Sequence, residues 1–212
     1  MKVGILGSGE VARDLAAGFL KYGHDVTLGT RDPAKLADFA KKHPQARVGS
    51  FADAAAFGEA VVLAVKGVAA ADALRLAGKA NVAGKPVIDT TNPITDAPPV
   101  NGVLKFFTTL DDSLMERLQR EYSDARFVKA FSCVGSASMV DPNFKGGRPT
   151  MFICGNHDGA KKTVIGILEQ FGWDVSDMGK AEGARAIEPL CLLWCIPGFL
   201  RNDWSHAFKM LS

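Results

Sequence analysis

Residues 2–12 read KVGILGSGEVA and contain the strongest structural signal in the chain. A short apolar run leads into the spacing Gly7-x-Gly9-x-x-Ala12, and an amphipathic segment follows at once. This order of strand, turn and helix is the context in which such a spacing indicates dinucleotide binding. Gly7 permits the tight turn, Gly9 lets backbone N–H groups approach a pyrophosphate, and Ala12 lets the helix pack on the strand. The candidate phosphate-binding residues are Gly7, Ser8, Gly9, Glu10, Val11 and Ala12.

The tip of the next predicted strand, GTRDP at residues 29–33, indicates which dinucleotide is bound. A site selective for NAD would place Asp or Glu there to accept a hydrogen bond from the ribose 2′-OH. Thr30 and Arg31 stand there instead, and Lys35 follows one turn into the next helix, a set that suits a 2′-phosphate. We expect Asp32 to cap its own helix. The sequence therefore favours NADP(H), and the alternative is that the two cations are solvated surface charges.

Composition limits the classes of protein to which the chain can belong. Its 212 residues, 47% of them apolar, suit one compact domain or one domain with a small appendage. The net charge of +2 and the lack of a basic run give no basis for a nucleic-acid partner. The longest apolar stretches read as strand-sized or as interrupted by proline and charge, so we expect no membrane span. Because the first strand begins at the N-terminus, we also expect no signal or transit peptide.

Cysteine and histidine usage points to a reduced compartment and to no metal site. The four cysteines show no CxxC spacing, and no histidine has metal-ligand spacing with a second histidine or cysteine. We therefore expect buried free thiols and a cytoplasmic location.

Apolar runs and helical patterns alternate with short connections, which predicts an α/β, doubly wound, mostly parallel Rossmann sheet. Strands are expected at residues 3–6, 25–28, 46–51, 59–66, 86–89, 126–131, 150–154 and 173–176. Helices are expected between them, and Ser50-x-x-Asp53 is a capping signal. From residue 181 on, the pattern predicts helix interrupted by Pro189 and Pro197. We expect residues 1–180 to form an NADP-binding Rossmann domain and residues 181–212 a short C-terminal helical segment.

Ligands of open α/β sheets bind outside the carboxyl ends of the strands, so the residues that follow the strands are candidates. Val65 and Lys66 follow the most apolar predicted strand and could approach the ribose or the phosphates. Thr90, Asn92 and Pro93 could hold the nicotinamide ribose or a polar group of the substrate. The alternatives are a solvated lysine at 66 and a simple turn at 92–93.

The segment SCVGSA at residues 132–137 is rich in small side chains and could let a flat ring approach the nicotinamide. Close packing of a helix on a strand would need the same residue types, and this alternative stays open. The candidate acceptor-binding residues are Ser132, Cys133, Val134 and Ala137.

Side chains for acid–base chemistry are hard to find. Only His206, of four histidines, lies in a segment that could fold over the site. A carbonyl reductase needs a proton donor beside the hydride acceptor, whereas a flavin-type ring can exchange its proton with solvent. The sequence therefore favours a redox cofactor as the acceptor and assigns no catalytic residue, although Lys66, Lys129 or a tyrosine could serve.

Four short segments together resemble one enzyme family: GSGEVA at 7–12, GTRDP at 29–33, DTTN at 89–92 and VKAFS at 128–132. They are similar to the deazaflavin (coenzyme F420)-dependent NADP reductases and to the cytoplasmic NADPH-binding domain of the six-transmembrane metalloreductases. The segment ARAIEPL at 184–190 also resembles the closing segment of both.

The resemblance implies a Rossmann core, hydride transfer between NADP(H) and a flavin or deazaflavin co-substrate, and an NADP-dependent oxidoreductase that is a homodimer. It implies that NADP(H) is held by Ser8, Gly9, Glu10, Val11, Thr30 and Arg31. Two other functions stay open. One is a small-molecule carbonyl or imine reductase, and the other is a non-catalytic NADP(H)-binding redox sensor.

The C-terminal segment carries more apolar surface than one short helix can bury against a finished sheet. Its large side chains include Leu190, Leu193, Trp194, Phe199, Trp204 and Phe208. Two-fold pairing would cover them, so we expect residues from about 190 to 208 to form a homodimer interface and part of the acceptor pocket.

Overall fold

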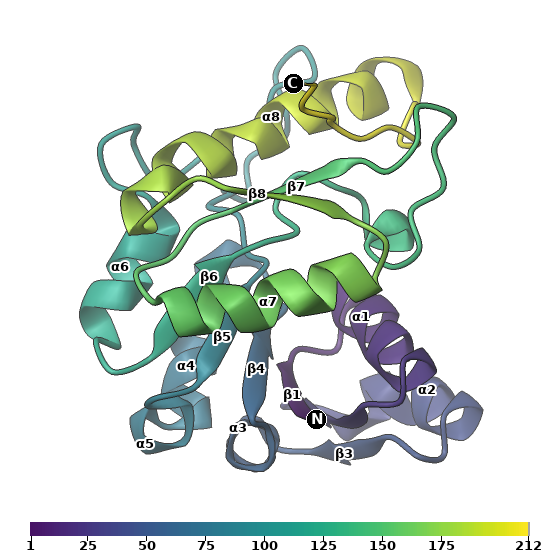
Figure 1. Ribbon diagram of the computed structural model, residues 1–212, viewed down its shortest axis with the longest axis vertical. Coiled ribbons are helices and arrows are strands. Elements are labelled where there is room, and N and C mark those ends of the chain that lie inside the picture. The colour runs from purple at the N-terminus through teal and green to yellow at the C-terminus, as the bar shows by residue number, and fades with distance from the viewer. Residues whose placement is uncertain (212) are drawn as a thin grey trace.

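A parallel sheet of six strands forms the centre of the computed structural model, which describes residues 1–211 (Figure 1). The strand order is β3-β2-β1-β4-β5-β6, which changes direction between β1 and β4 and so creates a switch point there. This confirms the Rossmann fold class predicted from the sequence. The strands are β1 (Lys2–Leu6), β2 (Asp25–Gly29), β3 (Arg47–Gly49), β4 (Ala60–Leu63), β5 (Pro86–Asp89) and β6 (Arg126–Lys129).

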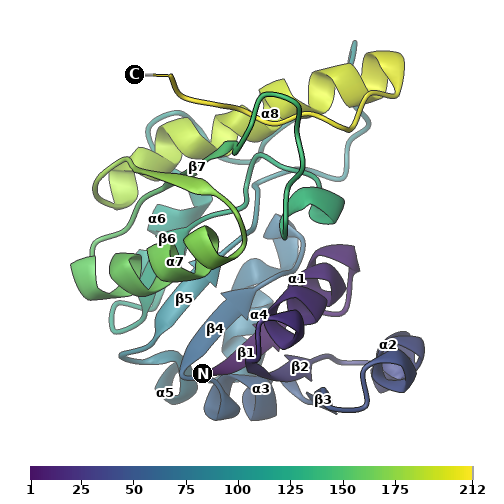
Figure 2. The same ribbon diagram turned by 45° about the vertical axis from the view of Figure 1, so that its right-hand side comes forward.

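Helices cover both faces of this sheet (Figures 1 and 2). One apolar core packs α1, α2 and α7 against one face of the sheet. A second core packs α3, α4, α5, α6 and the start of α8 against the other face. Every residue of β4 is buried, as expected for a central strand that is covered on both sides. The helices are α1 (Glu10–Lys21), α2 (Ala37–Lys42), α3 (Phe51–Phe57), α4 (Ala70–Ala77), α5 (Lys79–Val82), α6 (Leu114–Glu121), α7 (Asp158–Gln170) and α8 (Ala184–Arg201).

The last two strands leave the main sheet. β7 (Thr150–Ile153) and β8 (Asp174–Asp177) pair in parallel with each other, and α7 connects them. An isolated bridge between Lys129 and Cys154 joins this small sheet to the end of β6. The sequence predicts both strands, but the alternation of strands and helices carries no signal for which sheet they enter.

A local capping signal sets the boundary between β3 and α3. The Ser50 hydroxyl accepts from the Asp53 N–H at 3.1 Å, and the Asp53 carboxylate accepts from the Ser50 N–H at 2.9 Å. This capping box starts α3 at the next residue, as the sequence predicts. It also ends β3 at Gly49, so the strand expected over 46–51 is shorter than predicted.

The C-terminal segment differs most from its prediction. α8 runs without a break through Pro189 and Pro197, so the interruption expected at both prolines is wrong. The helix ends at Arg201, its C-cap residue Asn202 has a left-handed φ of 54°, and no helix follows it up to residue 211. Proline inside a helix removes an N–H donor and crowds the preceding turn. Tertiary packing outweighs that cost here, through buried residues such as Ile187, Cys191, Trp194 and Cys195.

The uninterrupted α8 also corrects the sequence-based expectation that the longest apolar stretches are either strand-sized or interrupted by proline and charge. Together with the preceding 3₁₀ turn, residues 181–201 are long and apolar enough to cross a membrane by length and composition alone. Core helices of soluble proteins pass the same test, so this property is weak evidence for a span. The expected absence of a membrane partner stays a prediction.

Candidate functional site

The turn between β1 and α1 requires glycine at its first position. Gly7 has a φ of +147°, and a Cβ atom there would lie 2.1 Å from the carbonyl oxygen of Ala64. The Gly7 N–H donates to the carbonyl of Gly29 at 3.0 Å, which ties the turn to the tip of β2. Ala12 lies fully buried behind the turn. The two strand tips predicted to hold the dinucleotide are therefore fixed against each other by backbone contacts.

The N-terminus of α1 opens into free space. Gly9 is the N-cap residue, and within residues 1–211 no side-chain hydrogen bond caps the first turn of the helix. A Cβ atom built on Gly9 would meet nothing within 4 Å. Helix N-termini present unpaired N–H groups and a partial positive charge, which together suit a phosphate. The observed geometry fits the pyrophosphate of a dinucleotide.

A groove of about 600 Å³ runs past this helix end. It joins the turn after β1, the tip of β2 and the loop after β4. The structure brings together most of the predicted cofactor residues, whereas Gly7 and Ala12 lie behind its wall. Its lining comprises Ser8, Gly9, Glu10, Val11, Arg31, Lys35, Ala64, Val65, Lys66, Ala69 and Thr90.

The tip of β2 and the 3₁₀ helix after it (Pro33–Leu36) bring two cations to the rim of the groove. Thr30 is buried, and its hydroxyl donates to the carbonyl and accepts from the N–H of Asp32, both at 3.1 Å. The Asp32 carboxylate accepts from the N–H of Ala34 and caps the following 3₁₀ helix, as the sequence predicts. Thr30 and Asp32 thus shape the turn, while Arg31 and Lys35 are exposed and line the groove.

A second cavity of about 240 Å³ continues the groove across the ends of β4 and β5. The two share Val65, Lys66 and Thr90. A Cβ atom on Gly67 would lie 2.0 Å from the carbonyl oxygen of Asn92, so the loops after the two strands touch there. The second cavity is lined by Val65, Lys66, Gly67, Thr90, Asn92, Ile94, Thr95 and Asp96.

Side chains of the loop after β5 are oriented by their neighbours. The Thr90 hydroxyl donates to the carbonyl of Leu63 at 3.0 Å, and the Asn92 amide donates to the carbonyl of Ser132 at 2.8 Å. This leaves the Asn92 Oδ1 atom buried without a partner. Pro93, the other candidate in this loop, is buried and lines neither cavity.

The segment predicted to receive an acceptor ring is closely packed. Ser132, Cys133 and Val134 are buried, whereas Ala137 is exposed, and none of them lines the cavities described above. A Cβ atom on Gly135 would lie 3.0 Å from the Trp194 ring of α8. Burial raises the pKa of Cys133 to about 12, so its thiol stays protonated at neutral pH. The acceptor-binding role of this segment stays a prediction.

Sequence reasoning missed a buried ionic cluster directly behind these loops. The Lys129 ammonium lies 2.7 Å from Asp89 and 3.0 Å from Glu188, and it donates to the carbonyl of Thr91 at 2.8 Å. Lys129 and Asp89 are fully buried. Burial alone would lower the pKa of Lys129, but the two carboxylates outweigh it and raise that pKa. The available signal was a charge of opposite sign at the end of each of two apolar strands.

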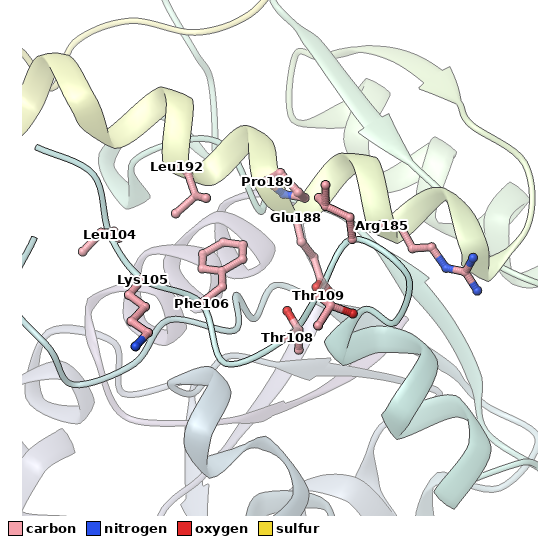
Figure 3. Close-up of a pocket in the computed structure, with 10 residues that line it drawn as sticks. Leu104, Lys105, Phe106, Thr108, Thr109, Arg185, Glu188, Pro189 and Leu192 are labelled. Atoms are coloured by element: carbon pink, nitrogen blue, oxygen red, sulfur yellow. The ribbon is translucent and has the colours of Figure 1, made fainter. Parts of the chain in front are cut away.

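A further cavity of about 360 Å³ lies between α8 and the loop of residues 104–110 (Figure 3). The Phe106 ring lies below Pro189 and Leu192, and Glu188 reaches from α8 toward the loop. Ile94 pairs with Phe106, so the same hairpin borders this cavity and the second cavity of the groove.

No histidine, cysteine or tyrosine lines the groove or its continuation within residues 1–211. His206, the histidine expected to come nearest, lies with its Nε2 atom 2.9 Å from the carbonyl of Trp194 and packs in the C-terminal segment. Lys66 and Asp96 are exposed and lie 3.8 Å apart. The groove therefore offers backbone donors and cations, and its only carboxylates, Glu10 and Asp96, are solvated at the surface.

Comparison with known proteins identifies relatives over the whole chain. The family described as NADP oxidoreductase, coenzyme F420-dependent, matches residues 2–93. The rat metalloreductase STEAP3 is 31% identical over 94% of this chain and 39% of its own length. The human metalloreductase STEAP2 is 26% identical over 99% of this chain and 40% of its own length. The chain thus spans about two fifths of the length of the curated relatives it matches.

Solved structures extend the comparison. A candidate F420-dependent NADP reductase from Arthrobacter sp. FB24 is 34% identical, with a TM-score of 0.94 over the full length of both chains. An imine reductase from Streptomyces aurantiacus is 17% identical, with a TM-score of 0.72 over 94% of this chain and 63% of its own; it shows a shared fold alone. The chain therefore belongs to the coenzyme F420-dependent NADP oxidoreductase family, a family of NADP-dependent oxidoreductases.

Proposed function

We propose that this chain binds NADP(H) along the groove and transfers hydride between it and a flavin or deazaflavin. The observation that carries the proposal is the meeting of an open helix N-terminus with Arg31 and Lys35 in one groove. The first feature suits the pyrophosphate, and the two cations suit the 2′-phosphate that distinguishes NADP(H) from NAD(H).

Each part of the groove has a defined task in this proposal. The N–H groups at the start of α1 hold the pyrophosphate, and the Arg31 guanidinium pairs with the 2′-phosphate. Thr90 and Asn92 contact the nicotinamide half at the other end. NADPH, when bound, supplies the hydride from its nicotinamide ring. The tied loops after β4 and β5 keep that half at a fixed depth in the groove.

The lining of the groove supports a flavin-type acceptor over a carbonyl or an imine. Reduction of a carbonyl needs a proton donor beside the reacting atom. The exposed Lys66 and Asp96 are the ionisable side chains at this end of the groove. A flavin or deazaflavin takes the hydride on its ring and its proton from water, so it needs no such donor.

A screen of acceptors against NADPH tests the proposal. We expect oxidation of NADPH, followed by its absorbance, with FMN, FAD or F420 and no turnover of cyclic imines or simple ketones. NADH should serve far less well. Turnover of imines without turnover of any flavin would overturn the assignment of the acceptor. If the chain binds NADPH tightly but oxidises it with none of these acceptors, a redox sensor would be favoured.

We also propose that the chain forms a homodimer through α8. Leu193, Phe199 and Leu200 are 44–55% exposed, although Trp194, part of the predicted apolar surface, is buried within the chain. Exposed leucines at this density favour a protein interface. Leu200→Glu should give a monomer by light scattering, and a monomeric unaltered chain would contradict the proposal.

The cytoplasmic location remains part of the proposal, supported by four free, buried cysteines.

A further inference from the structure

The segment of residues 90–92 is fixed from behind as well as from its sides. Thr90 and Asn92 bond to the neighbouring strand ends, as described above. Between them, Thr91 donates its N–H and its hydroxyl to Asp89 Oδ1, at 2.9 and 2.6 Å. The carbonyl of the same threonine accepts from Lys129. Every residue of the segment therefore has its orientation set by a specific hydrogen bond.

Glu188 brings α8 into this arrangement. Its Oε1 atom lies 3.0 Å from the Lys129 ammonium, and its two oxygens accept from the N–H groups of Met115 and Leu114, each at 3.0 Å. Those N–H groups belong to the first turn of α6. One carboxylate thus joins β6, α6 and α8, and it reaches down from α8 in Figure 3.

The ionic cluster lies directly behind the groove, so it does more than attach α8 to the rest of the fold. Its last member before the groove is Thr91, whose two neighbours, Thr90 and Asn92, are among the residues that line the nicotinamide end. A buried ion pair adds little net stability compared with apolar packing, but its geometry is demanding. The cluster therefore serves the placement of this segment better than it serves the stability of the fold.

Building on the proposed NADP(H) function, we propose that Lys129 and Glu188 are positioning residues for the nicotinamide half of the cofactor. They act through Asp89 and Thr91 and hold Thr90 and Asn92 at the groove. α8 is then part of the cofactor site, although none of its residues lines the groove.

Binding of two ligands separates this role from a structural one. NADPH occupies both ends of the groove, whereas 2′,5′-ADP carries only the adenosine and phosphate half. In Glu188→Gln we expect the dissociation constant of NADPH, measured by calorimetry, to rise 3- to 10-fold and that of 2′,5′-ADP to stay within twofold. The rate constant kcat with the acceptor found in the screen should fall at least 10-fold.

Glu116 offers a matched control. Its buried carboxylate pairs with Arg185 at 2.6 Å, so it also joins α6 to α8 through an ion pair. It lies in the same first turn of α6 as the N–H groups that hold Glu188, but its carboxylate bonds to Ser113 and Arg185 rather than to Lys129, and it does not line the groove. Glu116→Gln should therefore lower thermal stability, while both dissociation constants and kcat stay within twofold of the unaltered chain.

The following outcomes decide against the positioning role. If Glu188→Gln weakens both ligands equally or neither, the cluster is structural only. If that variant does not fold, Thr91→Val removes just the hydroxyl bond to Asp89, and the same selective loss of NADPH, two- to threefold, is expected. Absence of selectivity in Thr91→Val then overturns the proposal. If the unaltered chain binds 2′,5′-ADP but gains nothing from the nicotinamide half, the proposed function itself fails, and this assignment fails with it.

Discussion

The two ends of the groove are built in different ways. At the phosphate end, Gly9 and backbone N–H groups line the surface, and the cations Arg31 and Lys35 are exposed. At the nicotinamide end, the charges are buried behind the surface, and Lys129 is fully enclosed by two carboxylates. The proposed phosphate end is built from two short motifs, at residues 8–11 and 31–35, whereas the second end is shaped by residues 89, 129 and 188.

This difference separates binding strength from placement. A phosphate is held by dipoles and charges that need only be accessible. A ring that must present one carbon atom to an acceptor needs a wall of fixed shape, because small misplacements are costly to rate. Substitutions at the first end should therefore act mainly on NADPH affinity, whereas substitutions at the second end should lower kcat as well.

Gly9→Val tests the phosphate end most severely. The valine side chain would occupy the space that the pyrophosphate needs, and its Cβ atom would meet no protein atom within 4 Å. We expect NADPH affinity to fall at least ~100-fold, since the N–H groups of the helix start are lost to the ligand, while the urea midpoint barely changes. Gly159→Val, at the start of α7, is the matched control because its Cβ also meets nothing within 4 Å. Unchanged NADPH binding in Gly9→Val would show that the pyrophosphate does not bind at the turn after β1.

Arg31→Ala tests the selectivity assigned to the tip of β2. A charged hydrogen bond to the 2′-phosphate contributes about 1.5–3 kcal/mol, so NADPH affinity should fall roughly 10- to 150-fold. NADH lacks that phosphate, and its affinity should stay unchanged. Lys42→Ala, an exposed cation on α2 outside the groove, is the control for net charge. If NADPH and NADH lose the same affinity, Arg31 contacts a part of the ligand that both cofactors share.

The same contrast explains what the sequence could predict. The turn after β1 and the capping box at Ser50 and Asp53 are local, because a few neighbouring residues determine them, and the structure confirms their geometry. The order of apolar segments also predicts a Rossmann sheet. The departure of β7 and β8 into a second sheet and the continuity of α8 through two prolines depend on tertiary packing, which no local pattern encodes.

The candidate site divides along the same line. Residues that line the phosphate end are found by spacing, since the motif itself places them. Glu188 cannot be found in that way, because its partner Lys129 lies 59 positions earlier in the chain. Ser132 to Val134 carry small side chains that suit a ligand or close packing equally well, and the structure shows them packed.

The ion pair between Glu116 and Arg185 gives a pH test of how α8 is held. The Arg185 guanidinium lowers the pKa of Glu116 from 4.5 to about 2. A carboxyl with a lowered pKa in the folded state adds stability that is fully present above about pH 4.5 and is lost as pH falls toward 2. Glu116→Gln should lower the free energy of unfolding by about 2 kcal/mol at pH 7, and the difference should shrink toward zero near pH 2. Urea unfolding of both proteins across this range checks it, and a difference independent of pH would contradict it.

Lys35→Ala should have the smallest effect and would define the edge of the phosphate end. Lys35 is exposed on the 3₁₀ helix after β2, and it reaches the groove with a flexible side chain that water screens. Exposed ion pairs contribute about 0.2–1 kcal/mol, so NADPH affinity should fall only about threefold at low salt. Raising the salt concentration should remove most of that difference, because screening acts on exposed charges first. Calorimetry at two salt concentrations checks both statements. A loss as large as that of Arg31→Ala, and insensitive to salt, would mean that Lys35 lies enclosed against the 2′-phosphate, and the phosphate end would then be a shaped pocket rather than an open rim.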